Sequence, residues 1–171
     1  ENINVIDKYK LENLETIGST GSPLIHESFD YIYTSIKQDV SVASLSGGTD
    51  IVGCFIGGNP MSVVRRGEIQ GPILGMDVHV YDENANSLKN EKGELVCIKS
   101  FPSMPLFFWN DKNNEKYHDA YFNKYENVWC HGDYILKTEN NGFIIFGRSD
   151  ATLNPGGCLL YTSDAADDDH C

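Results

Sequence analysis

The hydrophobic pattern of this 171-residue chain changes its period along the sequence. Over residues 25–36 the apolar side chains recur at the spacing of one helical face, at Ile25, Phe29, Ile32, Tyr33 and Ile36. Over residues 76–81 they alternate with polar side chains, which is the period of a strand with one buried face. A chain with this pattern is expected to fold as an α/β region followed by a region that is mainly β.

Local signals predict the boundaries of several elements. Ser22 offers an N-cap oxygen, and Pro23 suits the first position of the helix because the missing N–H of proline costs nothing there. A short strand around residues 40–45 is expected to run into the glycine-rich turn 46–50. Two later strands, 128–136 and 143–146, are joined across Asn-Asn-Gly at 140–142 and are expected to form a hairpin.

Composition argues against several classes of partner. The formal net charge of −12 leaves no basic stripe for a phosphate backbone, so nucleic acid is not expected as a partner. No run approaches the roughly 18 to 20 apolar residues needed to cross a bilayer, so no membrane partner is expected either. The five cysteines never form a C-x-x-C pair, which argues against a zinc site or a disulfide framework. A cytosolic protein with reduced thiols is the expectation.

Four short segments combine glycine with polar residues: 18–23 (GSTGSP), 46–50 (SGGTD), 131–133 (HGD) and 147–150 (GRSD). Taken singly, each has a plain structural interpretation. A glycine turn often only caps a helix, Asp133 would then be a turn aspartate, and Arg148 with Asp150 would be a surface pair. In combination and in this order, the segments resemble the adenylate-forming superfamily of acyl-CoA synthetases, luciferases and peptide-synthetase adenylation domains, over about residues 15–157.

Further stretches make the resemblance closest to the acetoacetyl-CoA synthetase family, namely 67–70 (GEIQ), 93–97 (GELVC), 108–111 (FWND), 120–122 (AYF) and 147–155 (GRSDATLNP). The resemblance implies an α/β fold, the C-terminal part of the large N-terminal domain of an adenylate-forming enzyme. Residues 1–75 would be the α/β part of the AMP-binding domain, truncated at its N-terminus. Residues 76–147 would be its β-rich subdomain, and residues 148–157 the hinge.

The same resemblance implies where the adenine of ATP lies. Gly21, Ser22 and Pro23 would lie against one side of the ring, where small side chains let a flat ring approach closely. Gly47 and Gly48 would frame the other side of the purine.

The remaining site residues would contact phosphate, ribose and metal. Thr49 would bond the α-phosphate, and Asp50 would help to hold Mg²⁺, through a water because the family more often carries the longer Glu there. These two are the expected catalytic residues. Asp133 would accept both ribose hydroxyls, and Arg148 would donate to ribose and phosphate. Asp150 would be the hinge residue about which a small C-terminal domain rotates.

The implied activity is that of an acid–thiol ligase. ATP activates acetoacetate to acetoacetyl-AMP with loss of pyrophosphate, and CoA then takes the acyl group, so ATP, Mg²⁺ and CoA are the expected cofactor and co-substrates. Relatives specific for acetate are Trp-rich before the Thr-acid pair, whereas residues 46–48 here are Ser-Gly-Gly, which is expected to open volume for a longer acid. Two alternatives stay open: another short-chain acyl-CoA synthetase, and a non-catalytic nucleotide-binding remnant.

Some parts of the family pattern are not found in the sequence. The loop that holds the β- and γ-phosphates is expected upstream of Glu1, and the catalytic lysine downstream, since no Lys follows Lys137. After residue 157 the pattern breaks, and residues 158–171 are expected to be a disordered or foreign tail. The chain alone is therefore expected to be inactive.

Overall fold

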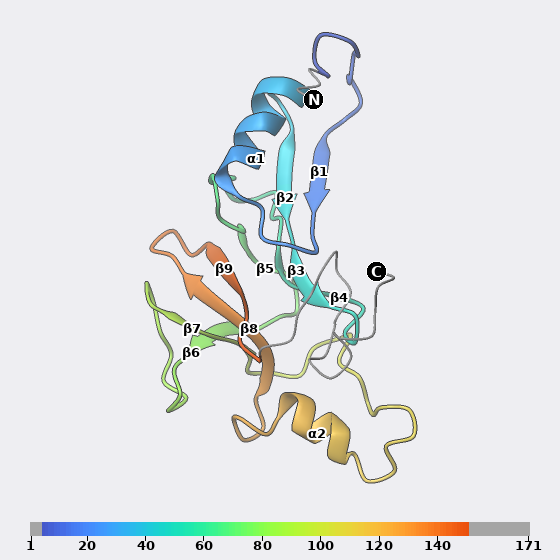
Figure 1. The fold of residues 1–171 in the computed structure, drawn as a ribbon, viewed down its shortest axis with the longest axis vertical. Coiled ribbons are helices and arrows are strands. Elements are labelled where there is room, and N and C mark those ends of the chain that lie inside the picture. Colours follow the sequence, from blue (N-terminus) through green and yellow to red (C-terminus); the bar gives the residue numbers. More distant parts are fainter. Residues whose placement is uncertain (1–4, 151–171) are drawn as a thin grey trace, which may run out of the picture.

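The computed structural model describes residues 5–150, and Figure 1 shows a helix-and-strand region above a region built mainly of strands. The elements follow in the order β1 (Thr16–Ser19), α1 (His26–Tyr31), the π-helical turn η1 (Ile32–Ile36), β2 (Ser41–Ser44), β3 (Ser46–Gly48), β4 (Gly53–Gly57), β5 (Gly71–Pro72), β6 (Val78–Tyr81), β7 (Lys92–Cys97), α2 (Glu115–Tyr121), β8 (Trp129–Lys137) and β9 (Phe143–Arg148). The predicted order, α/β first and then mainly β, is confirmed. None of the helices within residues 5–150 has the length and apolar character needed to span a membrane.

The first region is a β1–α1–β2 unit. Strands β1 and β2 pair in parallel, with Thr16 opposite Ser41 and Ser19 opposite Ser44. The helical segment between them buries Phe29 and Ile32 in a small core that also holds Val40 and Val42 from the β2 side. A crossover through a helix is what a parallel pair requires, because the chain must return to the same end of the sheet.

The helix begins later than the sequence predicts. Its N-cap is Ile25, in extended conformation, and no side chain caps it, so the N-cap prediction for Ser22 is wrong. Pro23 lies three residues before the helix, in the loop after β1. Ile25 is 59% exposed, because a cap residue has left the helical path and no longer shares the helix's buried face.

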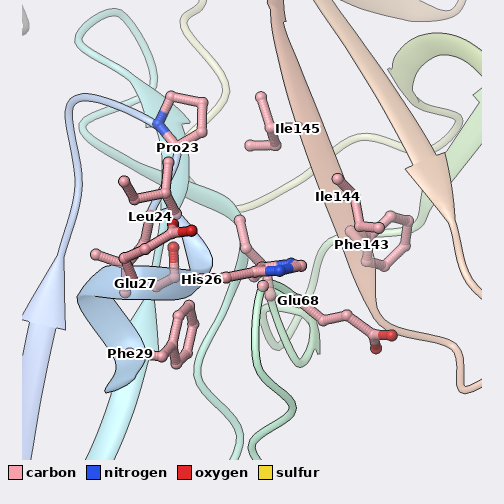
Figure 2. Close-up of a pocket in the computed structure, with 13 residues that line it drawn as sticks. Pro23, Leu24, His26, Glu27, Phe29, Glu68, Phe143, Ile144 and Ile145 are labelled. Carbon is pink, nitrogen blue, oxygen red and sulfur yellow. The ribbon is translucent and has the colours of Figure 1, made fainter. Parts of the chain in front are cut away.

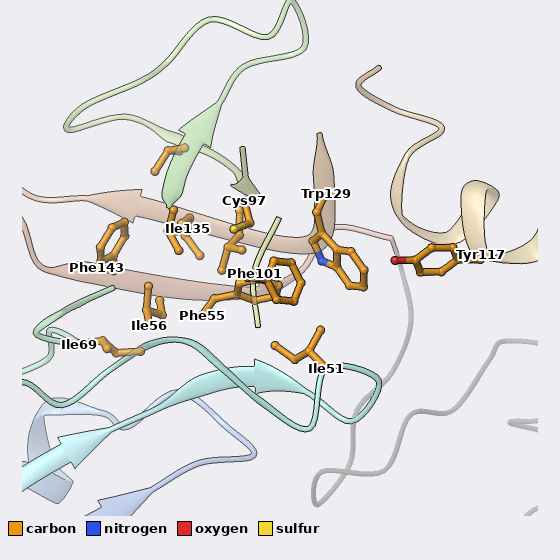
Figure 3. Packing of buried hydrophobic residues seen from close by; sticks show 13 residues of the cluster. Ile51, Phe55, Ile56, Ile69, Cys97, Phe101, Tyr117, Trp129, Ile135 and Phe143 are labelled. Carbon is orange, nitrogen blue, oxygen red and sulfur yellow. The ribbon is translucent and has the colours of Figure 1, made fainter. Parts of the chain in front are cut away.

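The second region contains two antiparallel sheets. One has the strand order β3-β4-β5, and the other the order β6-β7-β8-β9, a simple meander. The predicted hairpin is confirmed as β8 and β9, with Asn141 in the left-handed conformation at its turn. The two sheets share one core, and Figure 3 shows Phe55 and Ile56 of β4 facing Ile135 and Phe143 of the meander.

Aromatic side chains fix α2 to this core. Trp129, 1% exposed at the start of β8, stacks on Tyr121 with ring centroids 3.7 Å apart. Tyr117 and Phe122 contact the same indole edge-on, and Phe101 contacts it from the loop after β7. Such pairs add to the energy of burying the rings, so α2 is held against the end of β8.

Candidate nucleotide-binding site

The turn between β3 and β4 carries four of the predicted site residues. Gly47 and Gly48 end β3, and Thr49 and Asp50 are exposed in the turn that the Val52 N–H closes on the Thr49 carbonyl at 3.1 Å. Val52 has a φ of 47°, which is uncommon for a β-branched residue and marks local backbone strain of the kind found at functional sites. The turn therefore presents a hydroxyl and a carboxylate to solvent from a strained backbone.

Asp50 is held from outside the turn. The Tyr121 hydroxyl, at the end of α2, donates a hydrogen bond to Asp50 Oδ2. Because the Tyr121 ring is stacked on Trp129, the hydroxyl position is set by the packed core and not by a mobile loop. The sequence analysis gave Asp50 a role in the site, whereas Tyr121 entered it only as part of the matched stretch 120–122.

His131, in the first half of β8, contacts the backbone at the start of this turn. Its Nε2 lies 3.1 Å from the Gly47 carbonyl oxygen, and its ring contacts Phe55 at 4.8 Å between centroids. A carbonyl only accepts, so Nε2 carries the hydrogen. The residue is 5% exposed, and burial lowers its pKa, which keeps the imidazole neutral at physiological pH. Within the described residues its buried Nδ1 has no hydrogen-bond partner.

The two glycines of β3 are required by close packing. A Cβ on Gly47 would lie 2.0 Å from the Gly53 carbonyl oxygen, and a Cβ on Gly48 would lie 2.7 Å from Cε1 of His131. Both distances are far below van der Waals contact. The β4 backbone and the imidazole therefore require glycine at both positions, and the expectation that this stretch opens volume for a longer acid stays a prediction.

Asp133 and Arg148 form the second part of the site. They are cross-strand partners on β8 and β9, with Arg148 Nη1 3.4 Å from Asp133 Oδ1. Arg148 also donates from Nε to Asp150 Oδ1 at 3.1 Å and from Nη2 to Asp150 Oδ2. Asp150 is thus paired with Arg148, and its predicted hinge role stays a prediction.

The electrostatics of this part follow from burial. Asp133 is almost fully buried, and desolvation raises the pKa of its carboxyl although His131 and Arg148 oppose the shift. Burial works against the charge of Arg148, but its hydrogen bonds to Asp150 hold the pKa of the guanidinium above its ordinary value. Since His131 Nε2 is also 3.8 Å from Asp133 Oδ2, β8 links the carboxylate to the β3–β4 turn.

Pro23 lines a separate cavity of about 300 Å³, drawn in Figure 2, between the loop before α1 and strand β9. Its lining is mixed: apolar residues such as Phe29, Ile69 and Ile145 stand beside the polar or charged residues His26, Glu27, Ser44 and Glu68. Gly21 and Ser22 are exposed in the loop that leads to Pro23. The sequence analysis did not predict Ser44 or Ile145 as lining residues of a site. Their only signal in the sequence is position: Ser44 lies three residues before Gly47, and Ile145 lies three residues before Arg148.

The metal prediction rests on Asp50 alone. Among residues 5–150, no group of three or more His, Cys, Asp or Glu side chains is arranged to hold a metal ion. Mg²⁺ in phosphate sites keeps several waters and takes one or two carboxylates, the other ligands coming from the phosphates. A single exposed carboxylate beside Thr49 fits that requirement.

Comparison with known proteins identifies the chain's relatives, although no family model matches it. The acetoacetyl-coenzyme A synthetase of Rhizobium meliloti (strain 1021) is 54% identical over 156 residues, which cover 91% of this chain and 24% of that protein. The structure of acetoacetyl-CoA synthetase from Streptomyces lividans matches 93% of this chain and 25% of its own, with 40% identity and a TM-score of 0.79. The resemblance to the acetoacetyl-CoA synthetase family is confirmed.

The chain spans about a quarter of the length of the acetoacetyl-CoA synthetases that it matches. A second structure, the anthranilate CoA ligase AuaEII in complex with anthranoyl-AMP, matches 93% of this chain and 29% of its own with a TM-score of 0.71 at 20% identity, which bears on the fold alone. The fold class is confirmed as a mixed α/β segment, rich in sheet, of the adenylate-forming ligases. The predicted tail 158–171 and the hinge beyond residue 150 lie outside the described residues.

Proposed function

We propose that this chain is part of an ATP-dependent acetoacetate–CoA ligase and forms one wall of its nucleotide site. The observation that carries the proposal is the adjacency of Asp133 and Arg148 on β8 and β9, linked through His131 to the Gly47–Asp50 turn. Two motifs whose contacting residues are 84 positions apart along the chain thus lie in one place. A nucleotide needs such an arrangement, because its ribose and its phosphates require different partners a few ångströms apart.

The reaction has two steps. The acetoacetate carboxylate attacks the α-phosphorus of ATP, giving acetoacetyl-AMP and pyrophosphate, and the CoA thiol then attacks the acyl carbon and releases AMP. AMP must stay bound through both steps, so the groups that hold it serve each of them.

The described residues supply the binding. The cavity beside Pro23 offers apolar side chains to a flat adenine ring, and its polar lining residues are His26, Glu27, Ser44 and Glu68. Asp133 has two carboxylate oxygens for the two ribose hydroxyls, and Arg148, already oriented by Asp150, donates to the α-phosphate. The Thr49 hydroxyl donates a hydrogen bond to the same phosphate.

Asp50 would hold Mg²⁺, which would offset phosphate charge while pyrophosphate departs. Tyr121 restricts the rotamers of Asp50, so the carboxylate is oriented before the nucleotide arrives. The small-molecule partners are then acetoacetate, ATP and CoA. A cytosolic location and the division into a region 1–75, a subdomain 76–147 and a hinge 148–157 are part of the same proposal.

Two other functions are distinguished by one assay. Pyrophosphate release from ATP is measured for the full-length protein that contains this chain, with acetoacetate, butyrate, propionate and acetate as acids. We expect acetoacetate to give the highest kcat/KM. Highest activity on acetate or propionate would contradict the choice of acid and leave a different short-chain synthetase. ATP binding without pyrophosphate release for any acid would indicate a non-catalytic remnant.

The role of Asp133 is tested in the same protein. Asp133→Ala removes two hydrogen bonds to a charged acceptor, each worth roughly 1.5–3 kcal/mol, so ATP affinity should fall at least about tenfold. Asp119→Ala, which changes an exposed carboxylate on α2, is the matched control and should bind ATP normally. Equal affinities in the two variants would refute the ribose assignment.

A further inference from the structure

Glu94 is a buried acid that the nucleotide site does not use. It lies in the middle of β7 and is 4% exposed. A carboxylate at such depth needs several partners, because desolvation of an unpaired charge is costly. Its partners are Lys124 in the loop before β8, Cys130 in β8 and Ser149 directly after β9.

Both carboxylate oxygens of Glu94 accept hydrogen bonds. Lys124 Nζ donates to Oε1 at 2.7 Å, and Ser149 Oγ donates to Oε2 at 2.7 Å. Cys130 Sγ lies 3.8 Å from Oε2 and adds a weak third contact. The Lys124 ammonium balances the carboxylate charge through Oε1, and Oε2 accepts the hydrogen bond from the Ser149 hydroxyl.

Ser149 is held at two points as a result. Its N–H donates to the Gly132 carbonyl at 2.8 Å, and its hydroxyl reaches Glu94. The residue directly follows Arg148, which ends β9, and directly precedes Asp150. Because Ser149 is fixed through both its backbone and its side chain, the end of β9 and the adjoining Arg148 are held in place.

We propose that Glu94, with Lys124, is a positioning residue that anchors Ser149 and thereby keeps Arg148 in the nucleotide site. This inference rests on the proposed function for its use, but the anchor itself can be tested without nucleotide. Glu94 touches no predicted substrate atom and acts only through Ser149.

The first test is amide hydrogen exchange of the full-length protein that contains this chain, without nucleotide, in the Ser149→Ala and Glu94→Gln variants. Ser149→Ala leaves the buried Glu94–Lys124 pair intact, so it should fold. We expect the amide of residue 149 to exchange at least tenfold faster in both variants, while amides of β6 and β7 keep their protection. Thr138→Val is the matched control, because it removes another hydroxyl–carboxylate bond of the same meander, to Glu68 at 3.2 Å. It should leave residue 149 unchanged.

Unchanged exchange at residue 149 would overturn the anchor, and so would a loss of protection spread evenly over the sheet, since Glu94 would then act on stability alone. The second test is ATP affinity of the full-length protein, where Ser149→Ala should weaken binding several-fold and Thr138→Val should not. Equal affinities would overturn the link to Arg148. Failure of the unmodified protein to bind ATP would instead refute the proposed function, and the exchange result would still judge the anchor.

Discussion

The contact between Gly48 and His131 allows a stability prediction with a defined sign and size. In Gly48→Ala the new methyl would lie 2.7 Å from Cε1 of His131, so the ring must move by roughly 1 Å to restore van der Waals contact. The ring cannot move freely, because Nε2 is bonded to the Gly47 carbonyl and the ring contacts Phe55 in a T-shaped arrangement. Overpacking of this kind costs about 1–3 kcal/mol, and weakening the hydrogen bond adds about 1 kcal/mol.

His131→Ala removes the obstacle but has its own cost. It leaves a cavity and removes the hydrogen bond to the Gly47 carbonyl, which together should destabilise the fold by about 2–4 kcal/mol. In the double variant the methyl that Gly48→Ala introduces enters space that the ring has left. The two changes should therefore be less harmful together than their sum, by about 1–2 kcal/mol, which is the size expected for residues in contact.

The assay is urea unfolding of the chain in a Trp109→Phe background, where Trp129 is the remaining tryptophan and reports burial in the core. Gly71→Ala is the control, because a Cβ there has no atom within 4 Å. If Gly48→Ala is as mild as Gly71→Ala, or if the two single effects simply add, the packing argument is refuted.

The same region carries three further predictions. Burial lowers the pKa of His131 below the value of about 6.5 that it has when unfolded, so the unfolded chain binds more protons as the pH falls. The free energy of unfolding should therefore decrease between pH 7 and about 5.5, and His131→Asn should make this decrease smaller in urea titrations. Tyr121→Phe keeps the stacking on Trp129 but releases Asp50, so calorimetry should show a several-fold loss of Mg·ATP affinity with little change in the urea midpoint. Asp133→Asn removes a buried charge whose pKa is raised by desolvation, so at pH 7 the urea midpoint should be unchanged or higher although ATP affinity falls; a lowered midpoint would show that its pairing with Arg148 outweighs desolvation.

Local pattern predicted the elements whose stability is local. The helical face at Phe29 and Ile32 and the β8–β9 hairpin appear where the sequence indicates them, since periodicity and turn chemistry act over a few residues. The predicted start of α1 was wrong, because a cap is chosen by the path of the entering chain as much as by the residue type, and here the loop after β1 carries Ser22 and Pro23 past that position.

By itself, the sequence determined the order of the elements, the resemblance to the adenylate-forming ligases and the residues expected to touch the nucleotide. The tertiary structure decided how those residues are supported: His131 under Gly47, Tyr121 on Asp50 and Glu94 behind Ser149. These partners are separated by 84, 71 and 55 residues along the chain. No local spacing encodes contacts of that range, because they arise only when the two sheets and α2 pack around one core.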